Sequence, residues 1–251
     1  MNDKAKSFEQ LVDIFKQLRD PEKGCPWDIK QTHESLTEHL IEESYELLDA
    51  INSNDVAAIR EELGDVLLQV MLHSQIADDD SNFNVYDVIK ELSDKLVERH
   101  PHVFGDLEIE TAEDVKKNWD QIKNDKRKTG RLSGVPKAAP ALLKAEIIGK
   151  KVANANFDWE EVDDIKAKVK EELEEFLDTD AGSAEQTEEF GDLLFTLAQL
   201  ARRTDISSEA ALQAACKKFT KRYEHMESSA GSDLAGHSKD ELAQLWENAK
   251  S

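Results

Sequence analysis

Residues 61–68 read EELGDVLL, and residues 188–195 read EEFGDLLF. Both stretches continue into sequence whose apolar residues are spaced three and four apart, a pattern typical of helices. The two stretches lie 127 residues apart. The chain therefore contains two copies of one helical element.

The repeat extends over most of each half of the chain. The paired segments are 42–46 (EESYE) with 171–175 (EELEE), 94–99 (DKLVER) with 217–222 (KKFTKR), and Trp119 with Trp246. Their shifts lie between 123 and 129 residues, so the copies differ only by small changes in loops. We expect an all-α fold made of two tandem units of four to five helices.

Amphipathic spacing predicts helices throughout the chain. Only ten Gly and five Pro interrupt the 251 residues, and there is no alternating β-branched run that predicts a sheet. The predicted helices are 8–18, 34–51, 56–76, 85–99, 112–123, 140–153, 161–177, 185–203, 208–227 and 239–248.

A segment rich in glycine lies near the middle of the chain. Residues 128–136 (KTGRLSGVP) hold two Gly and one Pro between helical segments. We therefore expect a linker at 129–138, which joins an N-terminal domain of residues 1–128 to a C-terminal domain of residues 139–251.

The composition narrows the class of partner. The chain has 32 Lys and Arg against 54 Asp and Glu, a net charge of −22. Such a field repels nucleic acid, although it allows a compact polyphosphate that meets local positive charge. Residues 1–10 lack the apolar core of a signal peptide, and no stretch is apolar enough to span a membrane. We expect a cytoplasmic protein.

The two cysteines, Cys25 and Cys216, are too few for a disulfide framework or a thiolate zinc site. Both are expected to be small buried apolar residues. His100-Pro101-His102 follows a predicted helix, and we interpret it as capping and turn chemistry.

Carboxylate pairs recur at helical spacing, three residues apart on one helix face. Asp65 and Asp192 lie in helices expected to be buried, where a carboxylate needs a cation or strong donors. Gly64 and Gly191 suggest a close approach by another group, because glycine inside a helix is otherwise unfavourable. The pairs are Glu43 with Glu46, Glu62 with Asp65, Glu172 with Glu175, and Glu189 with Asp192.

If each pair of helices is antiparallel, its four carboxylates face one another. Four hard oxygen donors without His or Cys favour Mg²⁺ or Mn²⁺ over zinc. No Glu-x-x-His occurs, which excludes a di-iron bundle, and residues 78–89 lack the glycine and glutamate of an EF-hand. There is no P-loop either.

Positive charge gathers in the later helix of the second copy. Lys218 and Arg222 are four residues apart with Lys221 alongside, a place for phosphate oxygens, although such clusters are more often solvated surface. Trp246 is either an anchor in the core or a platform on which a nucleobase stacks.

Together these residues resemble the MazG family of nucleoside triphosphate pyrophosphohydrolases, whose mark is EExxE followed by ExxD on paired helices. The likeness includes residues 19–28 (RDPEKGCPWD), 98–104 (ERHPHVF) and 156–159 (NFDW). It implies two tandem MazG-like units and an all-α homodimeric hydrolase. It further implies Mg²⁺-dependent cleavage of NTPs and dNTPs to monophosphate and pyrophosphate, with Mn²⁺ as a substitute, broad base tolerance and a role in nucleotide housecleaning or stress.

The resemblance assigns catalysis to the C-terminal copy. The metal ligands and catalytic residues it implies are Glu172, Glu175, Glu189 and Asp192. The nucleotide contacts it implies are Lys168, Val169, Lys170, Glu171, Glu172, Glu185, Gln186, Thr187, Glu188, Asp192, Lys218, Phe219, Thr220, Lys221, Arg222 and Trp246. Residues 185–187 belong to the segment 178–187 before the second acidic motif, which we expect to be a variable loop.

The expected mechanism is metal-assisted attack of water on the α-phosphorus, with Lys218 and Arg222 taking charge on the pyrophosphate. Glu171, Glu188 and a metal ligand all remain candidates for the base. The N-terminal copy keeps Glu43, Glu46, Glu62 and Asp65 as a secondary metal site, but Glu98 and His39 replace two basic positions, so we expect weak or no turnover there.

Two other interpretations compete with an enzyme. A helical interaction module could bind nucleotide or metal as a signal without cleaving it, but it would not need the complete acidic, basic and Trp set of the C-terminal copy. An acidic bundle without a ligand leaves Asp65 and Asp192 unexplained.

Overall fold

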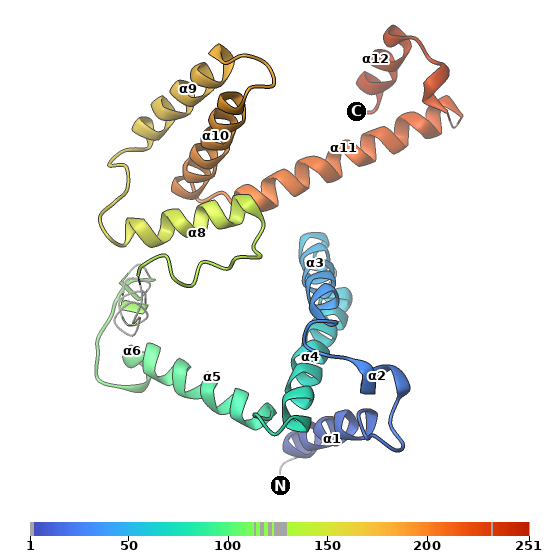
Figure 1. Cartoon of the computed structure of the whole chain (residues 1–251), viewed down its shortest axis with the longest axis vertical. Coiled ribbons are helices and arrows are strands. Elements are labelled where there is room, and N and C mark those ends of the chain that lie inside the picture. The colour runs from blue at the N-terminus through green and yellow to red at the C-terminus, as the bar shows by residue number, and fades with distance from the viewer. Residues whose placement is uncertain are drawn as a thin grey trace. The chain divides into compact units, whose positions relative to one another are not determined.

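The computed structural model describes residues 3–112, 114–115, 118–119, 122, 130–231 and 233–250, and these residues contain helices and turns but no strand. The chain divides into two compact units, Met1–Trp119 and Asp120–Ser251. Figure 1 shows the helices of both units. The expected all-α class with two tandem helical units is confirmed.

The helices of the first unit begin where polar side chains cap them. Asp55 accepts hydrogen bonds from the backbone N–H groups of Ala57 and Ala58, and Asn84 with Asp87 forms a capping box. The helices are α1 (Asp3–Leu18), α2 (Pro26–Lys30), α3 (Thr37–Ser53), α4 (Val56–Asp79), α5 (Val85–Arg99) and α6 (Pro101–Phe104).

In the first unit α3 and α4 pack side by side along their lengths (Figure 1), and the two-residue connection makes them antiparallel. The core lies where α1 crosses the end of α4. Its buried residues are Val12, Phe15, Leu36, Met71, Leu72, Ile76 and Val85.

Arg19 holds the segment between α1 and α3 against this core. Its Nε lies 2.6 Å from Asp79 Oδ2, and its guanidinium also donates to the carbonyls of Asp28 and Gln31. Gly24 is required in the same turn, because a Cβ there would lie 2.5 Å from the carbonyl oxygen of Leu18. These contacts fix α2 at one end of the α3–α4 pair.

The second unit is built around α10. The helix packs along α9 on one side and against α8 on another, and α11 extends from it to α12 (Figure 1). The elements are α8 (Ala141–Ala153), α9 (Val162–Asp178), α10 (Ala184–Arg203), α11 (Ser208–Ala230), the 3₁₀ turn η1 (Leu234–Gly236) and α12 (Lys239–Asn248).

Buried polar contacts lock α8 to its neighbours. Gln199 is 1% exposed and donates from Nε2 to the carbonyl of Ala145 at 2.8 Å. Glu146 on α8 accepts from the backbone N–H of Ser208 at 2.6 Å and from its hydroxyl at 2.7 Å. Because these buried groups are all paired, the start of α11 is held firmly on α8.

Asp158 forms ion pairs with two arginines of α10. Arg202 Nη2 lies 2.5 Å from its Oδ1, and Arg203 Nη1 lies 3.2 Å from its Oδ2. These hydrogen bonds and charges outweigh the effect of burial, so the pKa of Asp158 lies below its ordinary range. The loop before α9 is therefore anchored to the end of α10.

The helix predictions match the structure closely. The ranges 85–99 and 239–248 are confirmed, and most other helices differ by one to three residues at an end. The first helix starts earlier than predicted, at Asp3, and the short α2, α6 and η1 were not predicted. Half of the predicted helix 112–123 lies outside the described residues, and so does the domain limit at 128. The domain limits at 128 and 139 stay predictions.

The expectation that α4 and α10 are buried is wrong for the first turns of both helices in the single chain, whereas their later turns contain buried residues. Leu63 is 52% exposed and Phe190 is 47% exposed, Asp192 is exposed, and Asp65 is half-buried. Each helix is apolar over a wider arc than its neighbours within the unit cover. The expected close approach at Gly64 and Gly191 is also not seen, since no atom from outside the local helix backbone would lie within 4 Å of a Cβ at either position.

Cys216 is exposed and Cys25 is partly buried, so the expectation that both are buried is wrong. Cys216 lies on a part of α11 that no other described helix covers on that side. None of the described helices combines the length and apolar character that a membrane span requires.

Candidate metal and nucleotide site

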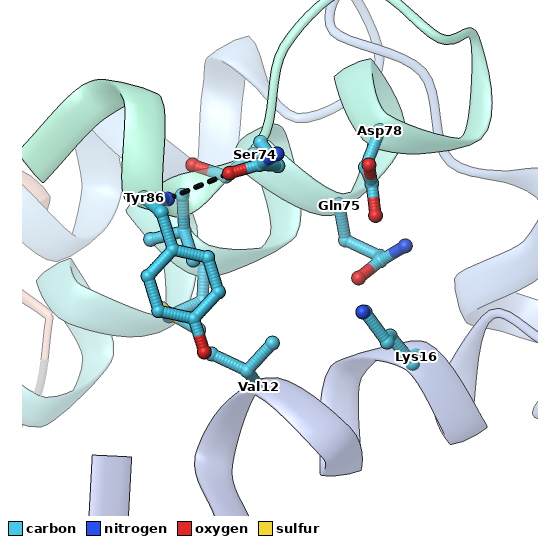
Figure 2. A pocket seen from close by; sticks show the side chains of 9 residues that line it. Val12, Lys16, Ser74, Gln75, Asp78 and Tyr86 are labelled. Carbon is cyan, nitrogen blue, oxygen red and sulfur yellow. Dashed lines mark hydrogen bonds between the residues drawn. The ribbon is translucent and has the colours of Figure 1, made fainter. Parts of the chain in front are cut away.

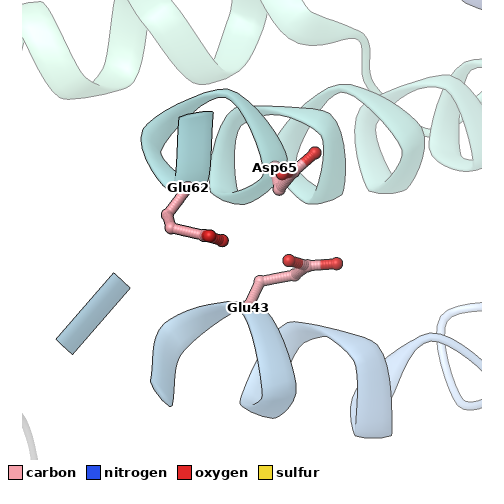
Figure 3. A group of neighbouring side chains, drawn as sticks. All are labelled: Glu43, Glu62 and Asp65. Atoms are coloured by element: carbon pink, nitrogen blue, oxygen red, sulfur yellow. The ribbon is translucent and has the colours of Figure 1, made fainter. Parts of the chain in front are cut away.

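Two clusters of three carboxylates lie at equivalent places in the two units. In the first unit Glu43 on α3 points toward Glu62 and Asp65 on α4 (Figure 3), and one oxygen from each lies within 4.8 Å of the others. The spacing of three residues brings Glu62 and Asp65 to one face of α4. The predicted facing of acidic pairs is therefore observed for three residues of this copy.

The second cluster repeats the first. Glu172 on α9 lies close to Glu189 and Asp192 on α10, and one carboxylate oxygen from each residue lies within 4.8 Å of the others. Glu172 is 5% exposed, Glu189 is half-buried and Asp192 is exposed. The set offers an inner carboxylate and two carboxylates that a ligand from solvent can reach.

Mutual repulsion and burial shift the acids of both clusters in one direction. Desolvation, followed by the charges of Asp65 and Glu46, raises the pKa of Glu43 above its ordinary value. Desolvation, followed by the charge of Glu46, raises the pKa of Glu62. A positive ion placed among these groups would relieve both effects.

Burial and repulsion also raise the pKa of an acid in the second cluster. Desolvation and then the charges of Glu175, Glu172 and Asp192 raise the pKa of Glu189. Glu46 and Glu175, the fourth acid predicted for each site, are exposed and lie outside the three-residue clusters. Their charges nevertheless reach the clusters, as the pKa shifts of Glu62 and Glu189 show.

One oxygen indicates what the first cluster lacks. Oε2 of Glu62 is buried and has no hydrogen-bond partner. A buried carboxylate oxygen without a partner is costly, and a hard divalent cation is a fitting partner for a set of carboxylate oxygens. The donor sets of both clusters therefore suit Mg²⁺ or Mn²⁺.

Lys168 distinguishes the second cluster from the first. Its Nζ lies 2.7 Å from Glu171 Oε1 and 2.8 Å from Glu172 Oε1. Hydrogen bonds to Glu171 and Glu172 raise the pKa of Lys168 well above its ordinary value, so it is fully charged. At the matching position of the first unit, His39 Nδ1 lies 3.7 Å from Glu42 rather than from a cluster residue.

The remaining predicted contacts on α9 and α10 lie around this cluster. Lys170 and Glu171 are exposed and Val169 is half-buried on α9. Glu185, Thr187 and Glu188 are exposed on the first turns of α10, and Gln186 is half-buried there. Residues 185–187 are thus helical, with Ser183 as N-cap, rather than part of the variable loop expected at 178–187.

The basic residues of α11 stand beside Trp246 on α12. Arg222 lies over the indole ring at 5.7 Å, and Phe219 packs against it with ring centroids 5.1 Å apart. Lys218, Thr220 and Lys221 are exposed. Trp246 is half-buried, so it is not a fully buried core residue. Its ring is also not free for stacking on all sides, because Arg222 and Phe219 contact it.

The first unit repeats this arrangement. Arg99 lies over Trp119 at 5.3 Å, which matches the pair of Arg222 and Trp246. His100 also packs edge-on against Trp119, with centroids 4.8 Å apart. The repeat seen in the sequence is thus also a repeat of side-chain contacts.

Within the described residues, the basic cluster of α11 forms no ion pair with the acids of α9 and α10. The main packing neighbours of α11 are α8, α10, η1 and α12. The structure brings Lys168 to the carboxylates, but it does not bring Lys218, Lys221 or Arg222 to them.

A pocket of the first unit lies away from its acidic cluster. Its volume is about 130 Å³, and none of Glu43, Glu62 and Asp65 lines it. Figure 2 shows Lys16 from α1 facing Gln75 and Asp78 of α4. The pocket does not coincide with the candidate site.

Sequence reasoning missed one contact at the second cluster and one contact elsewhere in the first unit. The ion pair of Lys168 with Glu172 has the i,i+4 spacing that favours such pairs, so the sequence held the signal. The stacked rings of His33 and His73, with Nδ1 atoms 2.8 Å apart, join residues 40 positions apart and carried no such signal.

A family model described as the MazG nucleotide pyrophosphohydrolase domain matches residues 31–104 and again residues 160–227. The chain belongs to the MazG family. The two matched regions contain both acidic clusters, and the second also contains the basic residues of α11. The MazG domain is therefore present twice.

Proteins from several bacteria are similar over nearly the whole chain. The nucleoside triphosphate pyrophosphohydrolase/pyrophosphatase MazG of Thermotoga maritima is 42% identical over 97% of this chain and 95% of its own length. The nucleoside triphosphate pyrophosphohydrolase of Escherichia coli K12 is 38% identical over 97% of both chains. YabN of Bacillus subtilis is 45% identical, but the match covers 51% of that longer protein.

Proposed function

We propose that this MazG chain is a Mg²⁺-dependent nucleoside triphosphate pyrophosphohydrolase. One water and one NTP or dNTP would give the monophosphate and pyrophosphate by cleavage between the α- and β-phosphorus. The observation that carries the proposal is the cluster of Glu172, Glu189 and Asp192 on α9 and α10. The relatives from Thermotoga maritima and Escherichia coli are nucleoside triphosphate pyrophosphohydrolases, which supports the same reaction.

The residues that would hold the metal are Glu172, Glu189 and Asp192, with Glu175 one turn from Glu172 adding negative charge. When bound, Mg²⁺ supplies positive charge that polarises the α-phosphate and makes water a better nucleophile. The carboxylates of α9 and α10 fix the position of that charge, because both helices are held side by side over their lengths.

The other side chains bind and orient the nucleotide. Lys168 is the cation already present at the cluster. Lys218 and Arg222 would neutralise charge that develops on the departing pyrophosphate, and Trp246 with Arg222 above its ring would receive the base. These roles require Lys218 and Arg222 to approach the acidic cluster, which they do not contact in the unit described above.

Three candidates for the general base remain, namely Glu171, Glu188 and a metal ligand. Glu171 is held by Lys168 at 2.7 Å, whereas Glu188 is exposed on the first turns of α10. A pH profile of kcat for Glu188→Gln beside Glu171→Gln separates the two, since only loss of the base removes the acidic limb.

We assign catalysis to the C-terminal copy. The N-terminal copy keeps the metal-type cluster and the pair of Arg99 and Trp119, but it has His39 in place of Lys168 and Glu98 in place of Lys221. Both changes remove positive charge where a triphosphate would bind, so we expect metal binding there with little or no turnover.

The test is product analysis by anion-exchange chromatography. The purified chain is incubated with each common NTP and dNTP in Mg²⁺ and then in EDTA. Monophosphate and pyrophosphate that disappear in EDTA support the proposal, and activity on several bases supports the broad tolerance expected of a housecleaning or stress enzyme. Diphosphate and orthophosphate would contradict it.

We also propose that the chain is a homodimer. Apolar side chains of α9 and α10 stay exposed in the single chain, including Leu177 at 67% and Phe190 at 47%. Exposed apolar surface of this kind is typical of an interface between subunits. Light scattering coupled to size exclusion should give twice the mass of 28.3 kDa, and a mass of 28.3 kDa would contradict the proposal.

A further inference from the structure

The two acidic clusters differ in whether a lysine side chain contacts them. In the second unit, Lys168 contacts the cluster residue Glu172 at 2.8 Å. In the first unit, the described residues place no lysine or arginine in an ion pair with Glu43, Glu62 or Asp65. The two copies therefore provide an internal comparison between a cluster with a cation and one without.

The ammonium group of Lys168 forms an ion pair with a carboxylate that a metal ion would also need as a ligand. The side chain of Glu172 is 7% exposed, so its oxygens have little access to water, and one of them is bound by the ammonium group. Glu172 is also the innermost member of the cluster of Glu172, Glu189 and Asp192. A divalent cation and the ammonium group therefore compete for the same inner ligand.

We propose that Lys168 is a positioning residue that makes metal binding at the C-terminal site depend on the nucleotide. This proposal rests on the function proposed above. Without nucleotide, Lys168 neutralises Glu172 and weakens binding of a divalent cation. When a triphosphate binds, its oxygens attract Lys168, and Glu172 becomes available to the metal.

The N-terminal cluster lacks this control. His39 contacts Glu42, at 3.7 Å, and Oε2 of Glu62 is buried without a partner. That cluster is therefore expected to bind a divalent cation without nucleotide. The Glu62→Gln background removes this contribution, so that the C-terminal site can be measured in the full-length chain.

The first experiment titrates Mn²⁺ alone into nucleotide-free protein and follows free Mn²⁺ by electron paramagnetic resonance. In the Glu62→Gln background, Lys168→Met should increase Mn²⁺ affinity by about tenfold or more, because it removes a positive charge in contact with a ligand. Lys168→Arg keeps the charge and should retain the weak affinity. Glu189→Gln, added to Lys168→Met, should abolish the gain.

Lys166→Met is the matched control. Lys166 lies on the same helix and forms an ion pair of the same kind with Asp163 at 2.8 Å, but it does not contact the cluster. It changes the net charge by the same amount as Lys168→Met. We expect its Mn²⁺ affinity to equal that of the parent, whereas an equal gain would overturn the proposal in favour of a general effect of charge.

The second experiment measures the affinity of the α,β-imido analogue of ATP in EDTA by calorimetry. Lys168→Met should weaken binding of this metal-free analogue by about tenfold, and Lys168→Arg should restore it. A residue that only supports the fold would not shift the affinities for metal and for analogue in opposite directions. If Lys168→Met weakened the binding of both Mn²⁺ and the analogue, or changed neither affinity, the proposal would be overturned.

If circular dichroism shows that Lys168→Met does not fold, Lys168→Gln replaces it in both titrations with the same expected signs. Neither titration depends on turnover. A chain that forms no pyrophosphate but shows these opposite shifts would retain the role of Lys168 in binding and lose only the proposed reaction.

Discussion

At the scale of single residues, Glu189 is the acid on which the proposed chemistry depends most clearly. It forms a cluster with Glu172 and Asp192, and desolvation followed by the charges of Glu175, Glu172 and Asp192 raises its pKa. Glu189→Gln keeps the shape and removes one negative ligand, so we expect pyrophosphohydrolase activity to fall on the order of 10²-fold. Steady-state release of pyrophosphate from dNTPs measures this.

Glu174→Gln is the control for that substitution. Glu174 is an exposed acid on α9 and lies outside the cluster, so its loss changes the charge of the helix without removing a ligand. Activity near that of the parent is expected. Equal losses in the two variants would show that total charge, rather than the cluster, controls the reaction.

Asp158 predicts a pH dependence of stability. Its pKa in the folded chain is lowered, as the hydrogen bonds and charges of Arg202 and Arg203 outweigh burial. The stabilisation is therefore present above the pKa of the unfolded chain, roughly pH 4, and is lost as the pH falls through the lower folded pKa. Urea unfolding between pH 7 and pH 3 should show the loss.

Asp158→Asn should lower the free energy of unfolding at pH 7 by about 3 kcal/mol, because it leaves the buried Arg202 without its anionic partner. The variant should also lose part of the acid dependence of the parent chain. A parent and a variant with parallel stability curves from pH 7 to pH 3 would contradict this role.

At the scale of helices, the N-cap of α4 positions the first acidic cluster. Asp55 accepts hydrogen bonds from two backbone N–H groups, seven residues before Glu62. Asp55→Ala should lower the free energy of unfolding by about 1 kcal/mol, whereas Asp55→Asn should retain most of the stability. Chemical denaturation followed by circular dichroism measures both, and equal stability of Asp55→Ala and the parent would contradict the cap.

Helices were predictable from sequence because their signals are local. Asp55 and Asn84 stand at the helix starts, and the apolar spacing of residues 85–99 gave the observed limits of α5. The clusters were predictable for the same reason, since three-residue spacing and a two-residue connection bring Glu43 to Glu62 and Asp65.

Burial was not predictable in the same way. The apolar arcs of α4 and α10 predicted buried helices, yet Leu63 and Phe190 are exposed in the single chain. A sequence pattern shows that a face is apolar, but it does not show whether the same unit or another subunit covers it. Tertiary contacts such as His33 with His73 likewise need the fold.

At the scale of the whole molecule, repulsion among acids is a global property of a chain with a net charge of −22. Mg²⁺ that binds the folded clusters should therefore raise the melting temperature. At a concentration of about 100 times the dissociation constant, the gain is roughly 2.7 kcal/mol for each site.

Differential scanning calorimetry in MgCl₂, compared with NaCl at equal ionic strength, measures this gain. The Glu62→Gln and Glu189→Gln double variant should lose most of it. A gain of the same size in NaCl, or in the double variant, would assign the stabilisation to screening of charge rather than to binding at the clusters.

The aromatic contacts divide the four tryptophans between the units in a useful way. Trp27 packs against His39 and Trp119 against His100, whereas the ring contacts described for the second unit place no imidazole beside Trp159 or Trp246. The indoles of the two units therefore have different aromatic neighbours, so the native chain carries an optical reporter that distinguishes events in its two MazG copies without any label.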